Sequence, residues 1–60
     1  MLKQWYVDQD GHQHGPLNHD EMIYFIETGC IKPADLAWTK GMTKWERIDQ
    51  IGDFYFLIWD

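Results

Sequence analysis

The chain has 60 residues, and its five Lys and Arg against ten Asp and Glu give a formal net charge of −5 at pH 7. This length predicts a single domain, residues 1–60, because a second hydrophobic core could not be filled. The acidic balance argues against nucleic-acid binding, which needs a basic face to displace counterions from phosphates. The single cysteine, Cys30, excludes an intrachain disulfide and a zinc site built from paired cysteines.

The hydropathy pattern predicts no membrane span. The longest apolar run, residues 54–59, has six residues, whereas a spanning helix needs about 20. The first residues contain no apolar stretch typical of a signal peptide. We therefore expect a cytoplasmic protein, or a cytosol-facing part of a larger membrane protein.

Two short strands are predicted at the start of the chain. Residues 3–8 include three good strand formers, Trp, Tyr and Val. The dipeptide Asp10-Gly11 predicts a tight turn, after which residues 12–15 would return antiparallel to the first strand. Side-chain alternation places Tyr6 on the opposite face of its strand from its two neighbours.

A helix is predicted from about Asn18 to Thr28. Asn18 is a favourable N-cap, and Glu21 stands three residues later, as in a capping box. Gly29 is suited to the left-handed position that follows a helix. The apolar residues with helical spacing form one face: Met22, Phe25 and Ile26.

The second half of the chain predicts two more strands, at residues 36–39 and 43–48, joined by a turn at Lys40-Gly41. The order β-β-α-β-β predicts an α+β fold, in which one helix packs on a small antiparallel sheet. Residues 49–60 form an apolar C-terminal tail, whose pattern fits either a short helix or a buried strand.

An ordered series of aromatic residues and glycines runs along most of the chain. Its members are Trp5-Tyr6-Val7, Gly11, Gly15-Pro16, Met22, Gly29, Leu36-Ala37-Trp38, Gly41-Met42 and Trp45. From about residue 3 to 48, this series resembles the GYF domain, and most closely the second, mostly bacterial, GYF family.

The resemblance implies a non-catalytic adaptor for protein–protein interaction, without a cofactor. GYF domains bind proline-rich segments on an aromatic patch built by the first strand, the Gly-Pro bulge and the helix. A proline-rich ligand is already extended, so docking it loses little conformational entropy. The candidate peptide-binding residues are Trp5, Tyr6, His14, Gly15, Pro16, Leu17, Met22 and Phe25. For Trp5, Met22 and Phe25 the alternative is a place in the core, the commoner position for such residues.

The sequence departs from the family at the aromatic patch. The family's Gly-Tyr-Phe is Gly29-Cys30-Ile31 here. Four other patch positions carry smaller rings or none: Val7, His14, Leu17 and Phe25. The resemblance therefore supports the GYF fold more strongly than it supports recognition of proline-rich segments.

The apolar tail suggests an alternative function. Six consecutive apolar residues cannot all face one core in a strand, because alternate side chains point to opposite faces. A structural domain that forms a homodimer through this tail, with no peptide ligand, is therefore the alternative. Its interface candidates are Phe54, Phe56, Ile58 and Trp59.

Neither an enzyme nor a metal site is predicted. Cys30 with a histidine is the one conceivable catalytic pair. Cys30, however, follows the C-terminal end of the predicted helix, where the helix dipole disfavours a thiolate. His12 and His14 lie on one strand face. Two ligands fall short of the four that structural zinc requires.

Overall fold

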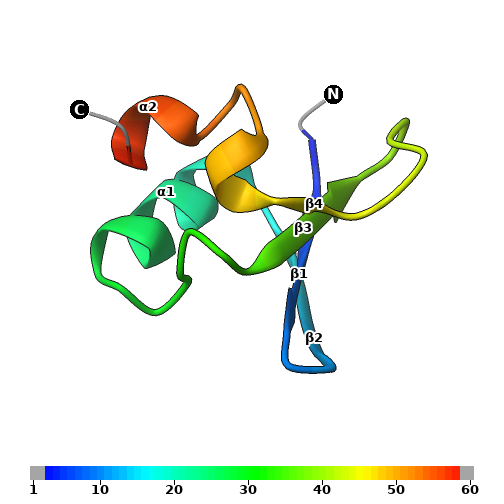
Figure 1. Ribbon diagram of the computed structural model, residues 1–60, viewed down its shortest axis with the longest axis horizontal. Helices are drawn as coiled ribbons and strands as arrows, with labels where there is room; N and C mark the ends of the chain where they lie inside the picture. The colour runs from blue at the N-terminus through cyan, green and yellow to red at the C-terminus, as the bar shows by residue number, and fades with distance from the viewer. Residues whose placement is uncertain (1–2, 59–60) are drawn as a thin grey trace.

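The computed structural model describes residues 3–58, except for the side chains of Phe56 and Ile58. Its elements are β1 (Trp5–Gln9), β2 (His12–Leu17), α1 (His19–Glu27), β3 (Leu36–Thr39), β4 (Glu46–Arg47), the 3-10 turn η1 (Ile48–Gln50) and α2 (Tyr55–Ile58). The strands form one sheet in the order β2-β1-β3-β4, with antiparallel neighbours throughout (Figure 1). This confirms the predicted α+β fold.

The limits of α1 follow from local hydrogen bonds. Asn18 Oδ1 accepts from the Glu21 amide at 2.8 Å, and Glu21 Oε1 accepts from the Asn18 amide at 2.9 Å. This reciprocal pair satisfies two amides that would otherwise lack partners at the helix start. Thr28 is the C-cap, and Gly29 follows with φ +83°. The helix therefore begins and ends close to the predicted residues.

The β4 strand is shorter than the predicted strand over residues 43–48. Of the residues in this segment, only Glu46 and Arg47 pair with β3. The next two amides donate to the segment that precedes β3, because Ile48 N bonds to Asp35 O at 2.9 Å and Asp49 N to Pro33 O at 3.1 Å. The chain therefore leaves the sheet at Ile48 and turns through η1.

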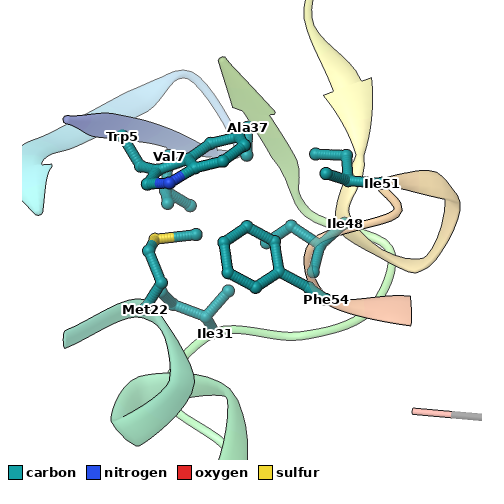
Figure 2. Packing of buried hydrophobic residues seen from close by; sticks show 8 residues of the cluster. All are labelled: Trp5, Val7, Met22, Ile31, Ala37, Ile48, Ile51 and Phe54. Atoms are coloured by element: carbon teal, nitrogen blue, oxygen red, sulfur yellow. The ribbon is translucent and has the colours of Figure 1, made fainter. Parts of the chain in front are cut away.

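The core lies between one face of the sheet and the helical segments. Strand alternation turns Trp5, Val7 and Ala37 toward this side. The Trp5 and Phe54 rings meet edge to face, with centroids 4.8 Å apart. Figure 2 shows the whole cluster, which contains Trp5, Val7, Met22, Ile31, Ala37, Ile48, Ile51 and Phe54. The sheet, α1 and the C-terminal segments therefore share one core.

The start of the apolar tail belongs to this core. Phe54 is an expected interface candidate, but it is 0% exposed. It is a core residue, and its ring is not available to another chain. Residues 55–58 form α2. The side chains of Phe56 and Ile58, and all of Trp59, lie outside the described part of the structure. Within residues 3–58, no helix is long and apolar enough to cross a bilayer.

A β-bulge interrupts the pairing of β1 with β2. Trp5 is opposite Leu17, and Val7 is opposite His14. Gly15 and Pro16 together therefore face the single residue Tyr6. Gly15 has φ +136°, and a Cβ there would lie 2.7 Å from the Trp5 carbonyl oxygen. Gly15 is therefore required by both its backbone conformation and its close approach to β1.

Arg47 and Asp49 tie β4 to η1. Arg47 Nε lies 3.2 Å from Asp49 Oδ1, and its Nη2 lies 2.7 Å from Oδ2. Asp49 is only 6% exposed. The hydrogen bond from Arg47 lowers the pKa of the Asp49 carboxyl, against the opposing effect of burial, and raises the pKa of Arg47. The pair therefore favours the charged form of Asp49.

Replacing Gly15 tests the bulge. Gly15→Ala should lower the free energy of unfolding by about 3 kcal/mol, because a strained φ adds to a backbone clash. Gly41→Ala meets positive φ but open space, so about 1–2 kcal/mol is expected. Gly52→Ala, without close atoms or positive φ, should change stability by less than about 0.5 kcal/mol. Urea unfolding measures all three, and equal losses for Gly15→Ala and Gly41→Ala would contradict the close approach.

Replacing Arg47 tests the ion pair through pH. Arg47→Gln should destabilise the protein near pH 7, because the Asp49 carboxylate loses its main partner. The folded pKa of Asp49 is below the unfolded value of about 3.9, so this stabilisation is present above about pH 4 and is lost as pH falls through the folded pKa. Urea unfolding from pH 7 to 2 should show the wild-type advantage shrinking below about pH 4.

Lys44→Gln is the matched control, since it removes an exposed cation that has no ion pair with any described residue. Its stability difference from wild type should stay small across the same pH range. A wild-type advantage over Arg47→Gln that stays constant down to pH 2 would contradict the assignment.

Candidate functional site

A groove runs between the β1–β2 hairpin and the C-terminal half of α1. Its volume is about 310 Å³, at the lower end of the range for ligand sites. Seven of the described residues line it: Val7, Gln9, His14, Leu17, Phe25, Cys30 and Ile31. They come from β1, β2, α1 and the loop after α1, and most of their surface in the groove is apolar. A space of this size takes one or two side chains of a larger ligand.

Gln9 fixes the loop that forms one wall of the groove. Its Nε2 donates to Cys30 O at 2.8 Å and to Asp35 Oδ2 at 2.7 Å. The same Asp35 oxygen accepts from the Lys32 amide at 2.9 Å. At the other end, the Ile31 amide donates to Phe25 O at 3.0 Å. These bonds hold residues 30–35 against both β1 and α1, which places Cys30 and Ile31 at the groove.

Three of the eight predicted peptide-binding residues line the groove: His14, Leu17 and Phe25. Two others are core residues, since Trp5 is 1% exposed and Met22 is 0% exposed. The core alternative therefore holds for both. Their faces of β1 and α1 meet inside the molecule, and a small domain needs these large side chains to fill its interior.

The remaining three predicted residues lie away from the groove lining. Tyr6 is on the other face of β1, where its ring lies 6.2 Å from that of Trp38. Gly15 and Pro16 are exposed in the bulge opposite Tyr6. They shape β2 without lining the groove. A single binding surface containing both Trp5 and Tyr6 is excluded by strand alternation.

The set of candidate residues lacked four that line the groove. The resemblance to the GYF family implies that Val7, Cys30 and Ile31 stand at positions of its aromatic patch, so it offers a signal for these three. Gln9 follows Val7 by two residues and therefore lies on the same strand face. Its role depends on contacts with residues 21 and 26 positions later in the chain.

The histidines do not assemble a metal site. His12 and His14 are exposed on β2, while the His19 ring stacks on Phe54 with centroids 5.5 Å apart. Across residues 3–58, no group of three or more His, Cys, Asp or Glu side chains could hold a metal ion.

Comparison with known proteins bears on the same positions. The family described as GYF domain 2 matches residues 5–54, which reaches from the core Trp5 to the core Phe54. A search of curated proteins finds no match to this chain. GYF domains are non-catalytic protein-interaction modules. Because this match covers five-sixths of its length, the chain belongs to the GYF domain 2 family.

Proposed function

We propose that the protein is a peptide-binding adaptor that docks an extended segment of a partner protein in the groove. One observation carries this proposal. The positions at which GYF domains carry their aromatic patch come from four separate segments and line a single groove here, namely Val7, His14, Leu17, Phe25, Cys30 and Ile31. The adaptor role expected from the family thus has a matching surface.

The lining of the groove favours a slender apolar ligand. Phe25 offers one aromatic ring, and the other apolar walls are aliphatic side chains and a thiol. A proline or a branched aliphatic side chain fits such walls, and an extended segment that presents it loses little entropy on docking. Stacking of successive prolines between several rings has less support.

The charge of the chain favours ligands with flanking Lys or Arg. A net charge of −5 attracts such ligands, mainly through faster, salt-sensitive association. We therefore expect the strongest ligand to combine an extended apolar or proline-containing centre with basic ends.

A peptide titration tests the groove. Amide NMR spectra should be recorded with three peptides: a proline-rich sequence with lysine ends, the same sequence with serine for proline, and a polar basic sequence. We expect chemical-shift changes to cluster at Val7, His14, Phe25 and Ile31. Phe25→Leu keeps an apolar side chain but removes the ring, so affinity should fall about fivefold to tenfold, equivalent to about 1–1.4 kcal/mol.

Tyr55→Leu is the matched control, because it removes a half-exposed ring on α2 that does not line the groove. Its affinity for peptide should equal that of wild type. Cys30 offers a second readout, since the thiol is exposed at the groove and a bound peptide should slow its reaction with a thiol reagent. Groove amides that stay unmoved by all three peptides at millimolar concentration would refute the proposal.

Gln9 should act as a positioning residue for the groove. Gln9→Met removes the two hydrogen bonds to the loop while keeping side-chain length, so we expect faster hydrogen exchange at the Lys32 amide and several-fold weaker peptide binding. The free energy of unfolding should fall by about 1–2 kcal/mol. Gln13→Met makes the same change at an exposed position of β2 outside the groove lining and should alter neither property. Equal exchange rates in the two variants would contradict this role.

A further inference from the structure

The sheet has a second face that carries aromatic side chains. Tyr6 pairs with Trp38, and Asp8 pairs with Leu36, so all four side chains leave the sheet on the side opposite the core. We call this the open sheet face. Both α1 and α2 lie on the other side of the sheet (Figure 1). Leu36 is 37% exposed, and the Tyr6 and Trp38 rings are partly exposed.

Opposite charges lie at the two ends of this face. Because β1 and β3 are antiparallel, the β1–β2 turn and the β3–β4 loop lie at opposite ends of the sheet (Figure 1). At the turn, a polar hollow of about 280 Å³ is lined by residues that include Asp8 and Asp10. Arg47 is opposite Leu36 at the same end, and its charge is paired with Asp49. At the loop, Lys40 and Lys44 are exposed and form no ion pair with any described residue.

This arrangement is complementary to itself. A twofold axis that lies in the interface and runs across the strands turns one open sheet face onto another and reverses the strand direction. Rings then meet rings, while the acidic end of each copy meets the basic loop of the other. We propose that two copies of the chain pair through the open sheet face, with Lys40 and Lys44 of each copy at the acidic hollow of the other.

The size of the molecule limits the strength of this pairing. The Cα extents are 28 × 27 × 18 Å. The area of one face is therefore smaller than the surface that each partner buries in a standard interface, which is about 800 Å². The net charge of −5 on each copy also opposes association. We therefore expect a dissociation constant on the order of 0.1–1 mM.

The pairing leaves the groove open. Val7 and Gln9, which line the groove, alternate with Tyr6 and Asp8 along β1 and so lie on the other side of the sheet. A dimer of this kind would present two grooves to a partner. The proposed pairing does not depend on whether the groove binds a peptide.

Sedimentation equilibrium from about 20 µM to 2 mM tests the proposal, because the apparent mass of a weak dimer rises with concentration. Lys40→Glu should weaken association at least tenfold. Lys32→Glu makes the same charge change at an exposed position in the loop after α1 and should leave association close to the wild-type value. Circular dichroism confirms that each variant is folded.

Mixing complementary variants distinguishes pairing from a folding effect. Asp8→Lys with Asp10→Lys reverses the charge of the hollow, and Lys40→Glu with Lys44→Glu makes the loop acidic. Each variant alone should be monomeric, whereas an equal mixture should associate. A wild-type protein that stays monomeric at 2 mM overturns the proposal. So does association that persists unchanged in the Lys40→Glu, Lys44→Glu variant, or a mixture that remains monomeric.

Discussion

The packing of Trp5 holds the parts of this small fold together. Trp5 lies on the inner strand β1, contacts Phe54 edge to face, and faces Met22 of α1 (Figure 2). Its indole N–H is buried and has no hydrogen-bond partner among the described residues, which costs about 1–3 kcal/mol. Burying about 150–250 Å² of the side chain contributes about 4–6 kcal/mol, so packing outweighs the unpaired N–H. A chain of 60 residues has little stability to spare, which keeps this ring in the core and away from a ligand.

The bulge in β2 converts this core into a support for the groove. His14 and Leu17 are three residues apart, so in a regular strand they would point to opposite faces. The extra residue of the bulge changes the parity, and both side chains line the groove. Gly15 permits this because its missing Cβ lets β2 approach the Trp5 carbonyl. The close contact beside the core and the shape of the groove therefore depend on the same glycine.

The sequence predicts those features that are encoded by neighbouring residues. The helix start is predicted from Asn18 and Glu21, and the hairpin turn from Asp10-Gly11, because each depends on atoms only a few residues apart. The groove depends on distant partners. Neither the bond from Gln9 to the loop after α1 nor the change of parity at the bulge follows from periodicity. The short β4 has the same origin, since its extent is decided by carbonyls of the segment before β3.

The residues that shape the groove fall into two groups, since Val7 and Ile31 also belong to the core whereas Cys30 and His14 do not. Trp5, Met22 and Phe54 are almost fully buried, and changing them removes packing that the domain needs. Cys30 and His14 are exposed at the rim, where a substitution changes the lining of the groove at little cost to folding. The GYF fold can therefore persist with a groove whose rings are reduced to aliphatic and thiol groups. What such a groove can accommodate is therefore decided by its aliphatic, thiol and single aromatic walls rather than by the aromatic patch of the family.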